Sequence, residues 1–379
     1  AIFWMWLSAF LGGASAFIES TLAQIYKKKN ADGSSYGGPA FYMRDALNAR
    51  WLGVIFSVLI IFTYAIGYNM LAAFNLQSTF QVFSFYGDRT PAIIGVILAA
   101  LFGAVVIGGA HRLVKVTGVL VPVMGIIYVA ISLIVLVLNI GNIPAMFAGI
   151  FKNAFDFQAI FGGFAGSCIM LGIKRGLYSN EAGMGSAPNA AATADVSHPV
   201  KQGLVQMLSV FIDTMLICTA TAFMCLSTNI IPQNYLGADG SADAAGYVQA
   251  ATASTLGKFG PIFIAFAMCL FAFTTLIGNY SYCEGCIRFI IQRDIKPGEL
   301  LAFRLFATAL VFVGSIASAG LVWNTADMMQ GLTNMPTILL LGGTAVKCLR
   351  DYQKQKAEGK DPHFMAADIE LKQDTDFWK

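Results

Sequence analysis

Charged side chains are scarce in this chain. Asp, Glu, Lys and Arg make up 12% of its 379 residues, whereas ordinary soluble domains carry about 25%. Hydrophobic residues account for 57%, and the mean hydropathy is +0.66. This composition excludes an ordinary soluble protein and indicates a polytopic membrane protein. The expected partner is the lipid bilayer, and no nucleic acid partner is expected.

Motifs for energy-coupled or covalent chemistry are also missing. No G-x-x-x-x-G-K-[ST] sequence occurs, so an ATP-driven pump has no support. The three histidines are scattered, and no pair of carboxylates is placed for acid and base catalysis. Cys283 and Cys286 form one isolated C-x-x-C without a second pair or a histidine cluster, which argues against a zinc or redox site. The sequence therefore predicts neither an enzyme nor an organic cofactor.

Long apolar runs are what the chain has instead. Windows of about 19 residues reveal segments near the ~20 residues that a helix needs to cross a bilayer. We predict nine spans, at approximately 1–26, 51–80, 91–110, 115–139, 157–175, 202–228, 259–289, 300–322 and 327–349. Residues 1–349 then form one all-α transmembrane domain, and residues 350–379 form a polar C-terminal tail.

The distribution of basic residues predicts the orientation of these spans. Alternate loops hold only Arg89, Lys152 and Lys258, three of the 24 Lys and Arg residues. The positive-inside rule therefore places the other loops and the C-terminus in the cytoplasm, and Ala1 outside. Because the chain starts inside an apolar segment that already faces outward, we expect at least one further helix upstream. The expected location is the cell membrane.

The sequence of residues 161–199 is the least typical of a simple membrane helix. Gly162, Gly163 and Gly166 lie within five residues of one another in an apolar segment, and each glycine costs a helix about 1 kcal/mol relative to alanine. Transporters build substrate sites from such broken helices. Glycine also lets helices approach closely, and this alternative remains open for each residue taken alone.

Two carboxylates lie within predicted spans. Asp213 stands near the middle of its span, where a charge costs at least ~2.5 kcal/mol, and we expect it to line a polar cavity. Glu19 lies about two turns from Lys27, so we expect it to snorkel or to pair with a basic residue rather than to act in transport.

Amides and hydroxyls complete the set of candidate residues. Asn69 and Gln77 are eight residues apart and share a helical face. Their amides suit a zwitterionic substrate, and interhelical hydrogen bonding is an equally good interpretation. Thr274 and Thr275 offer paired hydroxyls at mid-membrane depth, which can contribute oxygen ligands to a small cation.

The run GSCIMLGIKRGLYSNEAGMGSAP, followed by HPVKQGLVQMLSVFIDT, resembles the signature of the alanine or glycine:cation symporters, the sodium:alanine symporter family. The resemblance extends over residues 1–349, and NEAGMGSAP is its most specific part. It implies a LeuT-type fold of two inverted five-helix repeats around a central site, in which these nine spans are fold helices two to ten. Fold helix one, which carries part of the coupling site in the family, would precede Ala1.

Further site residues follow from the resemblance alone. It implies that Phe164, with Gly163 and Gly166, covers the substrate, that Gln77 lies near the site, and that Thr274 and Thr275 bind Na+. Asn279 stands where the family has a tryptophan, so the substrate preference can differ.

The expected function is symport of a small neutral amino acid, alanine or glycine, with Na+ as the coupling ion and H+ as the alternative. No protein partner is implied. An uncoupled facilitator or channel and a membrane protein that does not transport are the two rival interpretations.

Overall fold

The computed structural model describes residues 1–30, 33–108, 110–156, 168–235, 243–293, 295–318, 320–322 and 334–379, and for residues 110–117 the backbone only. Seven stretches of this described part are long and apolar enough to cross a membrane. They are α1 (Ile2–Ile25); α3 (Arg50–Ile60), η1 (Ile61–Tyr68) and α4 (Asn69–Ser78) in succession; α5 (Thr90–Ile107); α6 (Ala110–Leu138); α11 (Pro199–Val210), η3 (Phe211–Cys218) and α12 (Thr219–Leu226) in succession; α14 (Phe259–Ile291); and α15 (Pro297–Ile316).

These seven stretches correspond to seven of the nine predicted spans. Of the fifth predicted span, residues 157–167 lie outside the described residues, and the remainder falls in α9 (Cys168–Asn180). Of the ninth, residues 327–333 lie outside them, and α17 (Asn334–Ala357) continues eight residues beyond the predicted boundary at 349. The helical class and the membrane spans are confirmed, whereas the count of nine and the LeuT-type arrangement stay predictions.

Shorter elements connect the spans. The strands β1 (Lys28–Lys29) and β2 (Ser35–Tyr36) pair antiparallel. The connecting helices are α2 (Pro39–Leu47), η2 (Ile140–Asn142), α7 (Ile143–Ala154), α10 (Ala187–Ala191), η4 (Pro232–Tyr235), α13 (Ala244–Leu256) and η5 (Ala366–Ile369). The loop predicted at 229–258 thus contains a helix of 13 residues.

Prolines set the start of several helices. Proline occupies one of the first two positions of α2, α5, α7, α11 and α15. Its fixed φ suits a helix start, and its missing N–H would have no partner there in any case. These prolines therefore define where the five helices begin after the connections that precede them.

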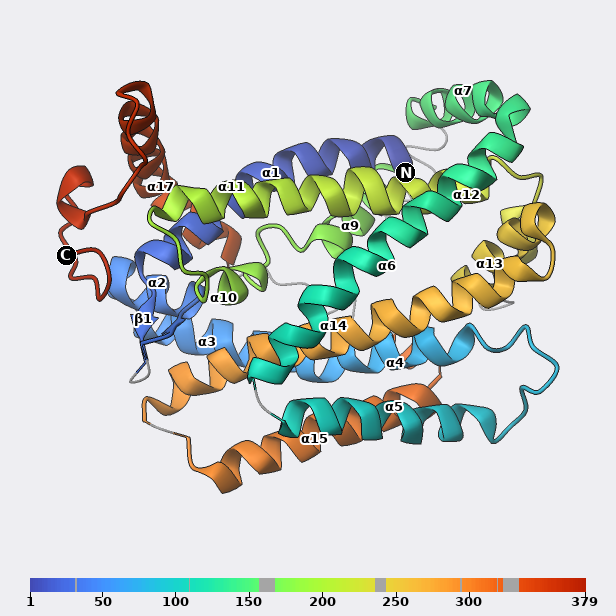
Figure 1. Ribbon diagram of the computed structural model, residues 1–379, viewed down its shortest axis with the longest axis horizontal. Coiled ribbons are helices and arrows are strands. Elements are labelled where there is room, and N and C mark those ends of the chain that lie inside the picture. The colour runs from blue at the N-terminus through green and yellow to red at the C-terminus, as the bar shows by residue number, and fades with distance from the viewer. Residues whose placement is uncertain are drawn as a thin grey trace.

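The long helices pack in two groups (Figure 1). In the first helix group, α1 packs along α9 and α11. In the second helix group, α15 packs along α5 and α4, and α14 along α4 and η1, while α6 crosses obliquely and contacts both α12 and α14. The helix α2 packs on α3 and so belongs with the second group.

Small residues let the helices of the first group approach closely. A Cβ on Gly176 of α9 would lie 1.9 Å from Ser8 Oγ of α1, and one on Gly172 would lie 2.3 Å from the carbonyl oxygen of Ala1. Both distances are far below van der Waals contact. Alanine at position 172 would meet backbone and force α9 away from α1, and alanine at position 176 would displace the Ser8 hydroxyl. This is the packing that small residues allow between membrane helices.

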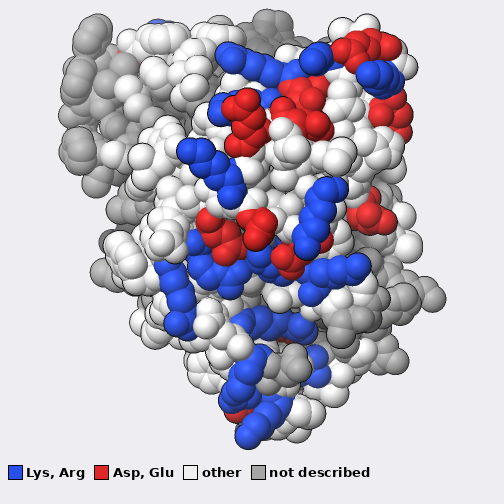
Figure 2. Space-filling view, turned by 90° about the vertical axis from the view of Figure 1, so that its left-hand side faces the viewer, with Lys and Arg blue, Asp and Glu red and all other residues white. Residues whose placement is uncertain are grey.

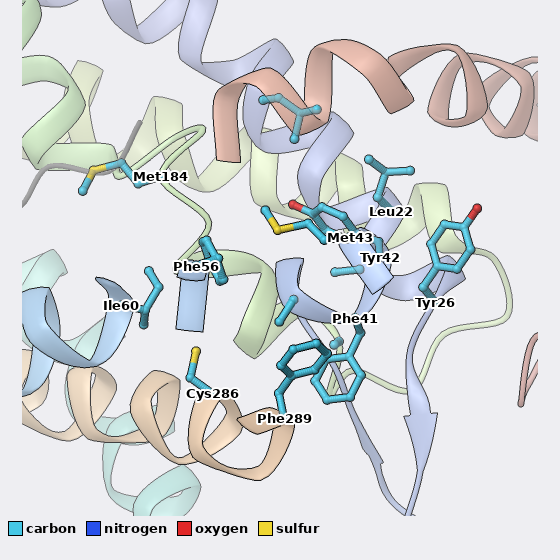
Figure 3. Close-up of a cluster of buried hydrophobic side chains, with 14 of the residues drawn as sticks. Leu22, Tyr26, Phe41, Tyr42, Met43, Phe56, Ile60, Met184, Cys286 and Phe289 are labelled. Atoms are coloured by element: carbon cyan, nitrogen blue, oxygen red, sulfur yellow. The ribbon is translucent and has the colours of Figure 1, made fainter. Parts of the chain in front are cut away.

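The largest buried cluster lies where the two groups meet α2 (Figure 3). It joins Leu22 of α1, Tyr42 and Met43 of α2, Phe56 of α3 and Phe289 of α14, all of them at most 2% exposed. Many other large apolar side chains are exposed along the helices, such as Leu339 at 79% and Ile126 at 70%. Exposed apolar faces of this kind suit contact with lipid.

The end of the molecule that faces the viewer in Figure 2 displays many charged side chains. We call it the basic end; it is formed by β1, β2, α2, the start of α11 and the end of α17. Lys28 pairs there with Asp45 at 3.0 Å, and Lys201 pairs with Asp361 at 2.8 Å. Basic residues from several of the loops that we predict to be cytoplasmic thus lie at this end.

Candidate functional site

Asp213 lies in a cluster of polar side chains inside a membrane span. Its carboxylate accepts a short hydrogen bond from Ser179 Oγ at the end of α9. The next residue, Asn180, donates from Nδ2 to Thr214 Oγ1 at 3.0 Å, and Cys218 Sγ lies 3.0 Å from Ser179 Oγ. These five side chains join the C-terminal end of α9 to η3, and we call them the Asp213 cluster.

The cluster owes its position to an unusual helix. Residues Phe211–Cys218 form a π-helix, as do Ile61–Tyr68 in the second helix group. Such segments are rare and are found frequently at functional sites. Thr219 Oγ1 donates to the Thr214 carbonyl at 3.1 Å and accepts from Trp6 Nε1 of α1 at 2.8 Å.

Asn69 begins α4 directly after the other π-helix. Its Oδ1 accepts from Asn279 Nδ2 of α14 at 3.1 Å, and the two side chains are 0% and 3% exposed. The Nδ2 group of Asn69 is buried and has no hydrogen-bond partner among the described residues. One of its amide groups therefore joins two helices, and the other remains as a donor. Both interpretations of Asn69 from the sequence agree with this geometry.

Gln77 and the threonine pair lie apart from the Asp213 cluster. Gln77 Oε1 accepts from Tyr86 Oη at 2.6 Å, in the connection that follows α4. Thr274 donates to the carbonyls of Leu270 and Phe271 in its own helix, at 3.0 Å each, and Thr275 is exposed. The Thr274 proton is thus engaged while its oxygen lone pairs stay available to a cation. The sodium site stays a prediction.

Gly163, Phe164 and Gly166 lie outside the described residues, so their role as a cover over the substrate also stays a prediction. In the described part of the chain, no group of three or more His, Cys, Asp or Glu side chains is arranged to hold a metal ion.

Glu19 differs from its sequence-based expectation. The side chain is 0% exposed and so does not snorkel, and no basic residue in the described part of the chain pairs with it. Its Oε1 accepts from the Gly183 N–H at 3.2 Å, and its Oε2 accepts from Asn334 Nδ2 at 2.7 Å. Asn334 Oδ1 in turn accepts from Tyr42 Oη at 2.5 Å. Glu19 therefore joins α1 to the turn after α9, to α17 and to α2.

Gly183 explains how the turn reaches the carboxylate. Its φ is +82°, and that of Gly185 is +89°, a left-handed conformation that glycine adopts at low cost. The backbone N–H can then point back toward α1. The NEAGMG motif thus supplies a backbone donor to Glu19. This contact could not be predicted, because the two residues are 164 positions apart in the chain.

Glu181 lies in the same turn. Its Oε2 accepts from Ser186 Oγ at 2.5 Å. Burial raises the pKa of this carboxyl to about 7, and the hydrogen bond from Ser186 opposes that shift. A group with such a pKa exchanges its proton near neutral pH.

Comparison with known proteins identifies the family of this chain. Residues 1–366 match the model of the sodium:alanine symporter family. The amino-acid carrier protein AlsT of Bacillus subtilis is 42% identical over 383 residues, which cover all of this chain and 79% of AlsT. A probable sodium/glutamine symporter, GlnT, of Bacillus subtilis is also 42% identical, over 96% of this chain and 74% of GlnT.

A third relative is named after both sodium and alanine. The sodium/alanine symporter AgcS of Methanococcus maripaludis is 35% identical over 94% of this chain and 79% of AgcS. These relatives are membrane transporters and not enzymes, as the absence of catalytic motifs predicted. A family match over nearly the whole chain, supported by such identities, confirms the resemblance: the chain belongs to the sodium:alanine symporter family.

Proposed function

We propose that this chain forms most of a symporter that carries a small neutral amino acid, alanine in the first place, into the cell together with Na+. A cation-coupled amino acid symporter is what the family supports. The observation that carries the finer proposal is the Asp213 cluster, in which a carboxylate and a hydroxyl of a membrane span meet a hydroxyl and an amide at the end of α9. Within the described residues, no Lys or Arg forms an ion pair with Asp213, so its charge is free to act on a transported cation or ammonium group.

The other candidate residues have roles in the same proposal. Asn69 offers its unpaired amide donor to the substrate carboxylate, and Gln77 lies farther out on the same helix. Thr274 and Thr275 contribute oxygen ligands to Na+, while Gly163, Phe164 and Gly166 cover the substrate. A LeuT-type alternation of access, with the two helix groups moving against each other, would open the site to each side in turn.

Uptake into proteoliposomes tests this function. The full-length transporter should accumulate radiolabelled alanine when an inward Na+ gradient is imposed, and glycine should compete. Equilibration without accumulation would support a facilitator, and no uptake under any gradient would support a protein that does not transport. Glutamine belongs in the competition series because one relative is named a sodium/glutamine symporter.

Coupling to H+ is the second candidate, favoured by the near-neutral pKa of Glu181. A relative from Bacillus sp. strain PS3, 34% identical, is named a sodium/proton-dependent alanine carrier. An inward pH gradient in sodium-free buffer separates the two cations. Accumulation of alanine under that gradient alone would show that Na+ is not required.

The orientation is also proposed, with the basic end in the cytoplasm. Single cysteines introduced at Gln233 and Lys360, both exposed, should react with an impermeant maleimide from opposite sides of the membrane. Reaction of both from the same side would overturn this topology.

A further inference from the structure

The segment after α17 does not extend into solvent, although its polar, mixed-charge sequence predicts a solvated tail. Residues 358–379 fold back along the basic end, where Phe364, Ile369 and Trp378 are only 4%, 7% and 7% exposed. The Phe364 and Trp378 rings pack edge to face, 5.5 Å apart, and the Ala366 N–H donates to the Trp378 carbonyl at 2.9 Å. The segment is thus a small folded unit with its own apolar contacts.

This segment is bound to the last turn of α1. Trp378 Nε1 donates to the Gln24 carbonyl at 2.8 Å. Lys27 Nζ lies over the rings of Phe377 and Trp378, at 4.7 and 5.1 Å from their centroids. Asp376 adds an ion pair of 3.4 Å with Lys28.

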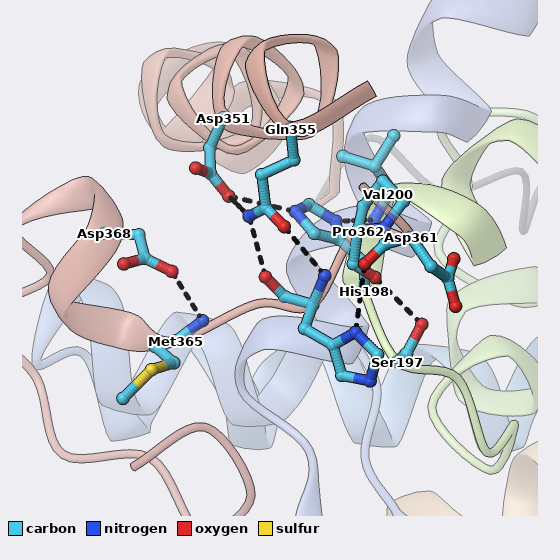
Figure 4. A network of polar contacts seen from close by, with 10 residues as sticks. Ser197, His198, Val200, Asp351, Gln355, Asp361, Pro362, Met365 and Asp368 are labelled. Atoms are coloured by element: carbon cyan, nitrogen blue, oxygen red, sulfur yellow. Dashed lines mark hydrogen bonds and ion pairs between the residues drawn. The ribbon is translucent and has the colours of Figure 1, made fainter. Parts of the chain in front are cut away.

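It is bound equally to the start of α11. The Phe364 N–H donates to the Ser197 carbonyl at 3.0 Å, and Ser197 Oγ donates to the Pro362 carbonyl at 3.0 Å (Figure 4). Lys201 Nζ forms an ion pair with Asp361 at 2.8 Å. Both helices of this contact, α1 and α11, belong to the first helix group.

The other side of the segment is fixed to α17. Gln355 donates from Nε2 to the His363 carbonyl at 2.7 Å and accepts from the His363 N–H at 2.9 Å. Asp351 of α17 bonds to His198 Nε2 at 3.2 Å (Figure 4). The His198 ring also contacts the rings of Tyr352 and Phe364 edge to face. At its other end, α17 is joined through Asn334 to Tyr42 of α2, which packs on the second helix group.

We propose that residues 358–379 form a latch that holds the first helix group to α17 at the basic end, and that this latch must release before the transport path opens there. This inference rests on the proposed transport function and deepens it with a means of control. The helix α17 also packs directly on α1 and α11, and the latch adds hydrogen bonds, ion pairs and buried rings between the same three helices. While the latch is bound, α1 and α11 cannot part from α17 at the basic end.

Native cysteines allow a direct test. Cys348 of α17 is 0% exposed and its thiol lies against the backbone of Val200 at the start of α11, so it reacts only when α17 and α11 part. Cys286 of α14 is 1% exposed and lies within the second helix group, which makes it an internal control. Labelling of each cysteine by N-ethylmaleimide is followed over time by peptide mass spectrometry on the full-length transporter in proteoliposomes.

The latch predicts that Trp378→Ala raises the labelling rate of Cys348 at least about tenfold, since truncation of a buried tryptophan weakens packing strongly. Cys286 should keep its rate. Trp378→Phe keeps a ring against Phe364 but loses the donor to Gln24, so an increase of about fivefold is expected, near the worth of one hydrogen bond. Asp374→Ala changes an exposed residue of the same segment and should leave both rates unchanged.

Because labelling is read without uptake, the latch and the proposed function can fail separately. An unchanged Cys348 rate in Trp378→Ala would overturn the latch. An equal rise at Cys348 and Cys286 would also overturn it, because the segment would then merely stabilise the whole protein. With the latch in place, Na+ and alanine should change the Cys348 rate in the unaltered protein but not in Trp378→Ala; an effect of equal size in both would contradict the required release.

Discussion

Substitution of Glu19 tests how a buried carboxylate is stabilised where no basic residue pairs with it among the described residues. Both of its oxygens accept hydrogen bonds from donors, the Gly183 N–H and Asn334 Nδ2. Asn334 Oδ1 in turn accepts from Tyr42 Oη. A donor therefore faces each oxygen of Glu19, and the side chain serves as an acceptor on both sides.

The expected magnitudes follow from counting the donors left unpaired. A buried polar group without a partner costs about 1–3 kcal/mol. Glu19→Ala leaves two donors unpaired, which lowers the free energy of unfolding by about 2–6 kcal/mol. Glu19→Gln keeps one acceptor, but its amide N–H then faces the other donor. The expected loss in the free energy of unfolding is about 1–3 kcal/mol. Tyr42→Phe removes only the last hydrogen bond of the chain, about 1 kcal/mol.

The midpoint temperature of thermal denaturation in detergent micelles gives the order of these variants. It should fall least for Tyr42→Phe, more for Glu19→Gln and most for Glu19→Ala. Glu358→Gln is the matched control, because its ion pair with Lys360 is exposed and such pairs contribute about 0–1 kcal/mol. A midpoint for Glu19→Gln equal to that of the unaltered protein would refute the reasoning, since it would mean that a neutral side chain satisfies both donors equally well.

Three further predictions concern transport and the latch. Asp213→Ala should abolish coupled alanine uptake while membrane insertion stays normal; near-normal uptake would make Asp213 a structural residue. Thr275→Ala should raise the Na+ concentration needed for half-maximal uptake at least about fivefold, as for the loss of one ligand, and leave alanine binding at saturating Na+ nearly unchanged; an equal loss of both would remove Thr275 from the cation site. In the docked latch the pKa of His198 is lowered, mainly by burial. Docking is therefore favoured above pH ~6.5 and weakens as the pH falls below that value. The ratio of Cys348 labelling to Cys286 labelling should rise from pH 7.5 to 5.5, and a constant ratio would contradict this. The charged groups that face His198 are Asp351, Lys201 and Asp368.

The sign of that pH dependence also has a geometric cause. His198 Nδ1 accepts from the Val200 N–H at 3.2 Å, so the proton of the neutral ring sits on Nε2 and is donated to Asp351. Protonation of Nδ1 would set two donors against each other at the start of α11. The stronger attraction of a charged ring to Asp351 opposes this loss, whereas burial of the charge increases the loss.

Much of the architecture could be predicted from hydropathy, because each span carries its own signal. Seven predicted spans correspond to observed stretches, and the depth of Asp213 was enough to predict its polar surroundings. The identity of its partners could not be predicted, since Ser179 and Asn180 are ordinary polar residues until the contact of α9 with η3 is known. The same holds for Glu19 and Asn334, which are 315 residues apart.

The packing of residues 358–379 was missed for a different reason. The segment is polar and of mixed charge, and its apolar residues Phe364, Ile369 and Trp378 show neither a helical nor a strand period. Its order comes from backbone bonds to Ser197 and Gln24, which carry no sequence signal. The prediction of a tail separate from the transmembrane domain followed from composition alone.

The π-helix before Asn69 gives the span a built-in means of rotation. An α-helix turns by about 100° per residue, and a π-turn holds one residue more than an α-turn. If η1 returned to α-helical geometry, α4 beyond it would rotate relative to α3 by the angle of one residue, about 100°. Asn69 would then leave Asn279, to which it is now bonded at 3.1 Å, and a different face of α4 would turn toward α14. A change of hydrogen-bond register by one residue in a single turn would thus exchange the side chains presented to the space between these two helices, without moving either end of the span through the membrane.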